Sequence, residues 1–458
     1  MLFQTWTFAV FFSIVYLVHL GVKGTRFRHL WLLLSSYVFY AWWSPFYLIL
    51  ITYSTAVDYL MVVLMSRGRR KAPWLCISVV NNLCLLGTFK YAAFVAENLT
   101  ALFEWLGVPY AVAAPGWLLP VGISFYVFQS LSYTIDFYRG KIERERSYIR
   151  YATFVSLFPR LMMGPIERAG NLLPQLREPT RITTQDVTDG ASLFVVGLFK
   201  KVAMADYLAR YVDMVYGSPG EYQSPALILA TFAYTWQIYF DFSGYTDMAR
   251  GVARMMGFRL MLNFNNPYLA TGLGEFWGRW HISLSTWFKD YVYIPLGGNR
   301  KGTFNTYRNM VLTMVISGLW HGAAWTFVIW GALHAAGRVV TRELERSPFY
   351  RDRVPTFVKQ MLVFAFVAFA WIFFRAESFA HACQIVSGIF TAGWADPRCP
   401  VWALILIFAT WAYQFAYESR LRWLLELAVV RMALVVFMVL YLAICTGGEA
   451  QGFIYLQF

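Results

Sequence analysis

The sequence predicts an all-α, polytopic integral membrane protein with about 11 or more spanning or re-entrant helices. Only 14% of its 458 residues are charged and 59% are hydrophobic, whereas roughly a quarter of the residues in a soluble domain carry charge. Apolar runs recur along nearly the whole length, and no polar stretch is long enough to form a separate soluble domain. We therefore expect a single transmembrane domain over residues 1–458.

The individual helices are predicted from the apolar runs, because an α-helix needs about 20 apolar residues to cross a bilayer. The run 30–43 is too short to cross without tilt, and several others are interrupted by Gly or Pro. Short, broken segments of this kind line cavities or are buried in protein. The predicted spans are 7–22, 30–43, 45–65, 74–97, 116–136, 189–215, 224–242, 309–337, 357–375, 402–418 and 428–446.

Two middle segments are more polar than the predicted spans. Residues 166–188 carry acids, amides, prolines and basic residues, which predicts a surface loop or an interfacial helix pair. Residues 259–304 are too polar to face lipid and too aromatic for a disordered loop. We expect the second segment to be re-entrant or to line a cavity.

The formal net charge of +14 comes from Lys and Arg residues that cluster between apolar runs. Membrane proteins place such clusters on the cytosolic side, so the charge does not indicate nucleic-acid binding. The clusters at 23–28, 67–71 and 139–150 are each separated by two predicted crossings, so all three can be cytosolic, and the clusters at 338–353 and 420–422 are expected on the same side. The N-terminus and the C-terminal tail are then expected to face outward, with 7–22 retained as the first span.

The five cysteines form no CxxC pair and no Cys/His spacing typical of a metal site. Most lie in apolar runs, where we expect them to be small core residues. The sequence therefore predicts neither a structural disulfide nor a metal ion.

Two histidines stand out, because His281 directly follows Trp280 and His321 directly follows Trp320, in or beside apolar runs. Ionisable groups at membrane depth are costly and usually functional, and imidazole transfers protons near neutral pH. The alternative is a buried histidine bonded to a nearby carbonyl. On one continuous helix, His334 would lie about 220° around from His321, so we exclude it from the site unless the glycines there break the helix.

Further polar residues surround His281. If this stretch is helical, Ser285 and Lys289 follow His281 on one face and form a polar stripe that could line a cavity. Arg279 and Asp290 bracket the stripe. The alternative is an interfacial amphipathic helix without a catalytic part.

Asp241 and Gln237 lie in the polar–aromatic stretch TWQIYFDFSGYTDMARG. Hydrogen bonds that hold the core together explain such an acid more readily than catalysis does. The sequence lacks the nucleophile elbow, the P-loop, HExxH and the dinucleotide-binding glycine pattern. What remains is an imidazole base, which suits proton removal from a hydroxyl that attacks an activated acyl group.

These motifs resemble the membrane-bound O-acyltransferase (MBOAT) superfamily, and in particular its bacterial alginate O-acetylase branch. The resemblance spans the chain, and the combination is more specific than any single piece. The matching stretches are 33–59, LPVGISFYVFQSLSYTIDFYRG (119–140), FPRLMMGPIER (158–168), 239–258, NFNNPYLATGLGEFWGRWHISLSTWFKDYVYIPLGGNR (263–300), SGLWHGAAWTFVIWGALH (317–334) and the tail FIYLQF.

The resemblance implies short, tilted helices around a central tunnel, with a catalytic region at about 235–337. It implies His321 as the catalytic base and His281 as a second site residue, which positions a reacting group or donates to the developing oxyanion. It further implies cytosolic acetyl-CoA as donor substrate, without a permanently bound cofactor. The acetyl group would cross the bacterial inner membrane, where periplasmic partner proteins of the SGNH type place it on a polysaccharide.

The acceptor stays open at this point. Acetylation of peptidoglycan or cellulose, or D-alanyl transfer to teichoic acid, are alternatives within the superfamily. An alternative from another class is a transporter or acyl-group channel without chemistry, in which acids and histidines relay protons.

Overall fold

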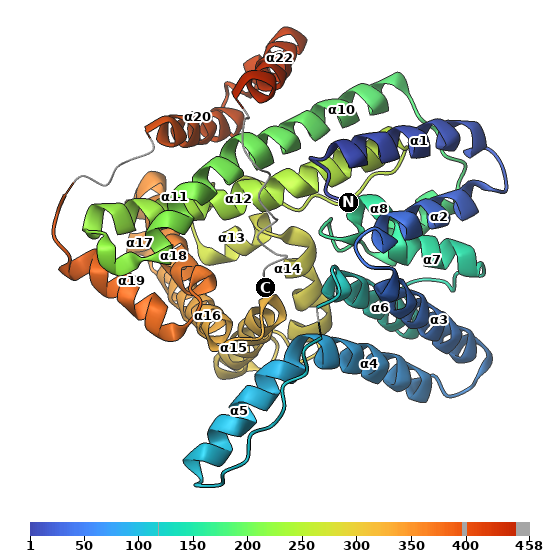
Figure 1. Ribbon diagram of the computed structural model, residues 1–458, viewed down its shortest axis with the longest axis horizontal. Coiled ribbons are helices and arrows are strands. Elements are labelled where there is room, and N and C mark those ends of the chain that lie inside the picture. The colour runs from blue at the N-terminus through green and yellow to red at the C-terminus, as the bar shows by residue number, and fades with distance from the viewer. Residues whose placement is uncertain (118, 396–400, 446–458) are drawn as a thin grey trace. The chain divides into compact units, whose positions relative to one another are not determined.

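The computed structural model describes residues 1–117, 119–395 and 401–445 (Figure 1). Within these ranges every regular element is an α-, π- or 3₁₀-helix, which confirms the predicted all-α class. The contacts divide the chain into two compact units, Met1–Ala191 with Ala249–Met261, and Ser192–Met248 with Leu262–Phe458. α10 and α12 each contribute to both units. The prediction of a single functional domain stays a prediction.

The first unit contains the N-terminal helices. They are α1 (Trp6–Val22), α2 (Arg28–Ala41), α3 (Pro45–Arg67), α4 (Ala72–Leu86), the π-helix η1 (Gly87–Tyr91), α5 (Ala92–Trp105), α6 (Ile123–Tyr138), α7 (Tyr148–Ser156), α8 (Phe158–Leu161), α9 (Ala169–Arg177) and the first part of α10 (Thr184–Leu198).

The second unit contains the remaining helices. They are the π-helix η2 (Phe199–Ala205), α11 (Asp206–Gly217), η3 (Pro219–Glu221), most of α12 (Ser224–Met255), η4 (Pro267–Leu269), α13 (Leu273–Arg279), α14 (Ile282–Phe288), the π-helix η5 (Lys289–Tyr293), α15 (Gly302–His321), α16 (Trp325–Arg346), α17 (Pro348–Arg353), α18 (Thr356–Arg375), α19 (Phe379–Thr391), α20 (Val401–Tyr417), α21 (Arg422–Glu426) and α22 (Ala428–Cys445).

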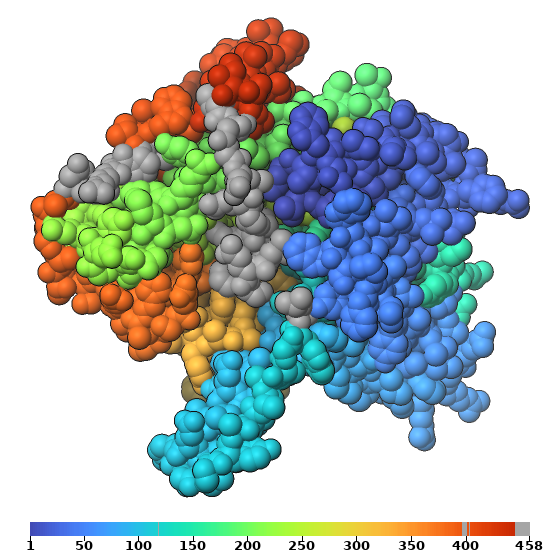
Figure 2. Space-filling model, viewed as in Figure 1, coloured from blue at the N-terminus to red at the C-terminus, as the bar shows by residue number. Residues whose placement is uncertain are grey.

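Three helical stretches of the described chain are long and apolar enough to cross a membrane, namely Pro45–Arg67, Ala72–Trp105 and Thr356–Arg375. Four shorter apolar helices accompany them, at Trp6–Val22, Phe379–Thr391, Leu404–Tyr417 and Ala428–Ile444. Large apolar side chains of α5 are exposed, including Leu102 and Trp105, and Figure 2 shows the atoms of this helix, in cyan, at the surface. Exposed apolar surface of this extent is expected where lipid replaces water. The predicted total of about 11 crossings is not reached by these criteria and stays a prediction.

The predicted span 309–337 is wrong as one helix. The chain breaks at residues 322–324 and turns back, so that α15 and α16 pack against each other. A Cβ on Gly331 would lie 2.5 Å from the carbonyl oxygen of Met314, and one on Gly318 would lie 2.2 Å from that of Phe327. Glycine is required at both positions because the two backbones touch.

The predicted span 189–215 is likewise interrupted, by η2 between α10 and α11. This π-helix carries consecutive lysines that reach acids on α12, with Lys200 2.7 Å from Asp247 and Lys201 2.7 Å from Asp241. Lys201 also pairs with Asp206 at 2.8 Å. Through this π-helical segment, the consecutive lysines Lys200 and Lys201 reach two different acids on α12.

Two smaller expectations meet different outcomes. Segment 166–188 forms α9 and the start of α10, as the helix-pair alternative predicted. The cysteines were expected in the core, but Cys76, Cys84 and Cys383 are exposed. An apolar run predicts a helix in an apolar environment, and it does not say whether protein or lipid supplies that environment.

Candidate active site

His281 occupies the corner between α13 and α14, and its backbone is left-handed, with φ of 42°. Such a conformation is rare for a residue with a side chain and costs on the order of 1–3 kcal/mol. The corner is fastened by Asn263, whose carbonyl accepts the backbone N–H of Ile282 at 2.9 Å. The imidazole of His281 is thereby placed in the interior, with none of its surface exposed. The stretch that follows, Ile282–Phe288, is helical as the sequence predicted, and His281 is the N-cap residue of that helix.

One side-chain oxygen fixes the protonation pattern of His281. Oδ1 of Asn263 accepts the backbone N–H of Ser283 at 3.3 Å and its hydroxyl at 2.9 Å, so this atom is the amide oxygen. Nδ1 of His281 lies 3.1 Å from the same oxygen and must therefore donate its proton to it. In the neutral ring the lone pair is then on Nε2, where a base would need it.

His321 is the last residue of α15 and is also buried, with 4% of its surface exposed. Its ring centroid lies 5.1 Å from that of Trp330 on α16 and 5.3 Å from that of Phe374 on α18. Gly322 makes this turn possible, because a Cβ there would lie 2.0 Å from the ring of Phe327. The end of α15 is therefore held among aromatic rings.

Trp320 connects the two histidines. Its ring centroid lies 6.1 Å from that of His281 and 5.0 Å from that of His321. The two histidines, which are forty positions apart in the chain, thus share one aromatic neighbour. The structure places Trp320 near both histidines, and their role in one site stays a prediction.

Trp280 belongs to the same aromatic cluster through a different path. Its ring lies 5.0 Å from Phe264 and 5.1 Å from Trp371, and Trp371 stacks on Trp330 at 5.6 Å. Trp330 in turn contacts His321. These tryptophans surround the histidines with rings, which exclude water from the interior.

The other predicted site residues have structural partners. Arg279 pairs with Glu275 at 2.8 Å and also with Glu418. Burial alone would raise the pKa of the Glu275 carboxyl, but hydrogen bonds from Thr271 and Arg279 outweigh it and hold that pKa below its usual range. Asp241 is the buried partner of Lys201.

Three predicted residues remain to be placed. The hydroxyl of Ser285 donates to the carbonyl of Trp280 at 3.1 Å. Asp290 lies half-buried on η5, after α14 has ended. Gln237 is buried on α12, and no hydrogen bond to its Oε1 is found within the described ranges. None of the three is shown in contact with either imidazole.

His334 needs a different explanation from the one the sequence supplied. The helix is broken before it, so the argument from rotation on one helix does not apply. Its ring lies 4.7 Å from Trp330 and 5.1 Å from Trp277. Neither ring nitrogen has a hydrogen-bond partner among the described residues. His334 therefore shares Trp330 with His321 but shows no polar contact.

The sequence did not reveal Asn263, Ser283 or Trp330 as site residues. Asn263 is 18 positions from the histidine it orients, and its surroundings NFNNPY offer three asparagines without a spacing that selects one. Among the described residues, no group of three or more His, Cys, Asp or Glu side chains could hold a metal ion.

The comparisons with known proteins concern the family of the chain. Residues 139–386, which include both histidines, match the membrane-bound O-acyltransferase family, MBOAT. The "Probable alginate O-acetylase AlgI" of Pseudomonas aeruginosa is 42% identical over 398 residues, which is 86% of this chain and 75% of that protein.

More distant relatives carry other names. The "Peptidoglycan O-acetyltransferase" of Helicobacter pylori is 34% identical, over 80% of this chain and 74% of that protein. The "Teichoic acid D-alanyltransferase" of Bacillus subtilis is 26% identical, over 63% of this chain and 77% of that protein.

Proposed function

The chain belongs to the membrane-bound O-acyltransferase family, and on this premise we propose that it transfers acetyl groups from cytosolic acetyl-CoA toward an exported, alginate-like polysaccharide. It is an integral membrane O-acyltransferase of the alginate O-acetylase branch. The observation that carries the chemical part is the pair of buried imidazoles that both lie near one ring, Trp320.

His321 is the general base in this proposal. Its imidazole takes the proton from the acceptor hydroxyl as the hydroxyl oxygen attacks the thioester carbonyl of acetyl-CoA. The carbon–sulfur bond then breaks, and the CoA thiolate takes the proton back from the imidazolium. Base catalysis of this kind contributes about 10²–10⁴-fold to a rate.

His281 acts as a positioning group. Because its Nδ1 proton is directed at Asn263, the neutral ring has no proton on Nε2 to donate to an oxyanion. Of the two roles considered from the sequence, this favours positioning, in which Nε2 accepts a hydrogen bond from a reacting group. The aromatic surroundings limit loss of the thioester to water.

The choice of acceptor rests on the relatives. The alginate O-acetylases reach 42% and 43% identity, whereas the peptidoglycan enzyme is 34% and the D-alanyl enzyme 26% identical. Peptidoglycan is therefore the second candidate. In our proposal the acetyl group reaches its acceptor hydroxyl directly or through a periplasmic partner of the SGNH type.

The proposed location is the bacterial inner membrane with both termini outward. The positions of the basic clusters between apolar runs support it, because such clusters stay on the cytosolic side. A tunnel from that side to the histidines belongs to the proposal as well.

The test is thioester consumption by the full chain in proteoliposomes supplied with acetyl-CoA, with and without a periplasmic fraction. We expect His321→Ala to lower CoA release by about 10²–10⁴-fold. His381→Gln is the matched control and should retain activity, since the ring of His381 bonds to the backbone carbonyl of Tyr216 and accepts the N–H of Glu377. Near-wild-type release by His321→Ala would refute the assignment, and solute passage without thioester cleavage would favour the transporter.

A further inference from the structure

The short turn between α3 and α4 carries three consecutive exposed cations, Arg69, Arg70 and Lys71. With Tyr138 at the end of α6, and with two small residues of α4, they line a cavity of about 600 Å³ in the first unit. Pockets that hold small ligands typically measure about 300–1,000 Å³. The cavity is therefore large enough for a polar headgroup.

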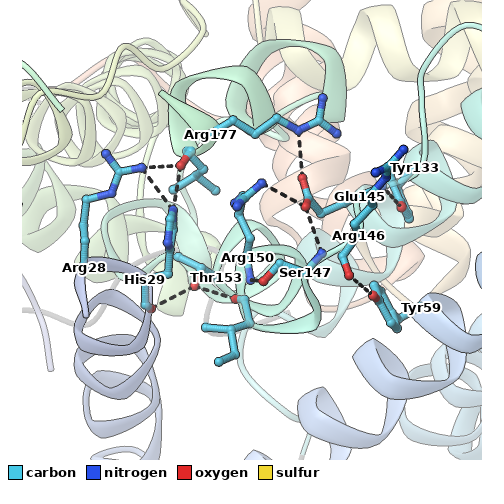
Figure 3. A network of polar contacts seen from close by, with 12 residues as sticks. Arg28, His29, Tyr59, Tyr133, Glu145, Arg146, Ser147, Arg150, Thr153 and Arg177 are labelled. Carbon is cyan, nitrogen blue, oxygen red and sulfur yellow. Dashed lines mark hydrogen bonds and ion pairs between the residues drawn. The ribbon is translucent and has the colours of Figure 1, made fainter. Parts of the chain in front are cut away.

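These three charges are not neutralised by acidic side chains in the described part of the protein. Within the described part of the chain, none of the three cations forms an ion pair with an acid. The contrast lies in the same unit, where the buried Glu145 binds Arg150 at 3.1 Å and Arg177 at 2.9 Å (Figure 3). Three like charges side by side repel one another, so an external anion would stabilise the turn.

Neighbouring groups add to the positive potential. The ammonium of Lys71 lies 5.6 Å from the ring of Phe137, which is within cation–π range. Arg144 donates to the hydroxyl of Ser66 at 2.8 Å and so brings a further cation to the end of α3. The positive-inside rule accounts for basic residues between spans, but it does not account for a cavity that these residues line.

The turn is also placed at a particular depth. It joins Pro45–Arg67 to Ala72–Trp105, two of the stretches long and apolar enough to cross a membrane, and α3 and α4 lie side by side in Figure 1. The end of both spans is the level of the lipid headgroups. Tyr138 fits this level, because tyrosine combines an apolar ring with a polar hydroxyl.

We propose that this cavity binds the phosphate headgroup of an anionic phospholipid in the leaflet that the turn faces. Arginine binds phosphate through two parallel N–H groups, and basic pockets between spanning helices are suited to anionic headgroups. The phosphates of CoA share this chemistry. The lipid is the better occupant because its phosphate is already fixed at the depth of the turn, and because the cavity is lined by the first unit alone.

The test measures lipid binding to the purified full chain by native mass spectrometry, in phosphatidylcholine nanodiscs that contain added phosphatidylglycerol. The triple variant Arg69→Gln, Arg70→Gln, Lys71→Gln should lower the apparent affinity for phosphatidylglycerol by about 100-fold. The single variant Arg70→Gln should lower it about fivefold, which keeps the test informative if the triple variant fails to fold.

The matched control removes the same charge elsewhere. Arg346, Arg351 and Arg353 are exposed and lie outside the cavity, so their triple Gln variant should bind phosphatidylglycerol within about twofold of the unchanged chain. Equal loss in both triple variants would overturn the proposal. Unchanged phosphatidylglycerol binding in both cavity variants would also overturn it. So would cavity variants that lose binding of CoA, measured in the same nanodiscs, while they keep binding of phosphatidylglycerol.

Discussion

Two regions of the molecule bury polar groups in opposite ways. In the first unit, the Glu145 carboxylate is nearly fully buried and is surrounded by donors from Arg150, Arg177 and the backbone of Ser147 (Figure 3). Arg28 nearby donates to the carbonyl of Glu178 at 2.6 Å and to the hydroxyl of Thr180 at 2.7 Å. In the second unit, the imidazoles of His281 and His321 are surrounded mainly by aromatic rings.

Under the proposed function, this difference separates polar groups that hold the fold from polar groups that take part in the reaction. A charge that is cancelled on several sides stabilises loops, but it cannot change its protonation state cheaply. A neutral imidazole keeps a lone pair, and in the proposed mechanism that lone pair accepts a proton once substrate is bound. Lys201 and its two acids show that the second unit also contains cancelled charges, so the contrast belongs to the sites and not to the units.

The largest effect on this contrast, after loss of His321 itself, should come from Asn263. The variant Asn263→Leu removes the oxygen that orients Nδ1 of His281 and also binds Ser283. We expect the rate of acetyl transfer to fall by roughly 100-fold, as loss of an orienting partner does elsewhere. Asn263→Asp keeps the acceptor and should lose less. Equal activity of both variants in the CoA-release assay would argue against the orienting role.

A smaller effect is expected where backbone packing, without any polar contact, supports the site. Gly331→Ala would force α15 and α16 apart, because the new Cβ meets the carbonyl oxygen of Met314 at 2.5 Å. We expect a loss of about 2 kcal/mol in stability, seen as a lower midpoint of thermal unfolding in detergent. Gly21→Ala in α1 is the control, since nothing lies within 4 Å of its Cβ position. If both variants melt alike, the close crossing does not matter for stability.

The smallest effect should come from the polar network of the first unit. Glu145→Gln keeps the shape but removes the charge shared by Arg150 and Arg177, whose side chains are 27% and 37% exposed. Water can partly replace the lost partner, so we expect a loss of about 1–2 kcal/mol. Glu343→Gln, which breaks an exposed pair with Arg346, should change stability by less than about 0.5 kcal/mol. Acetyl transfer by the folded fraction should be unchanged in both variants.

Local sequence was sufficient to find part of the site. His281 and His321 each follow a tryptophan, and an ionisable residue beside apolar neighbours is conspicuous without any knowledge of the fold. Trp320 is adjacent to His321 in the chain, so its contact with that ring follows from bonding alone. Its proximity to the ring of His281, at 6.1 Å, comes only from the tertiary structure.

Other parts of the site depend on contacts that sequence spacing does not encode. Asn263 reaches His281 because the chain folds back through the left-handed corner at that histidine. The stretch is helical from Ile282 onward, as assumed, but the sequence did not indicate that the hydroxyl of Ser285 bonds to the backbone of Trp280. Arg279 and Asp241 were predicted site residues because they are charged. In the structure, Arg279 forms ion pairs with two acids and Asp241 forms one with a lysine.

By itself the sequence determined the helical class, the membrane environment, the family and the two histidines, because hydrophobicity and short motifs act through neighbouring residues. Only the tertiary structure decided where helices break, which face of an apolar helix is covered by protein, and which partner orients the imidazole of His281. The break at 322–324 and the glycine contacts of α15 with α16 show the reason. The sequence of a helix that is apolar on all sides does not indicate which face packs against which other helix. Packing between segments distant in the chain therefore determines how these helices are arranged.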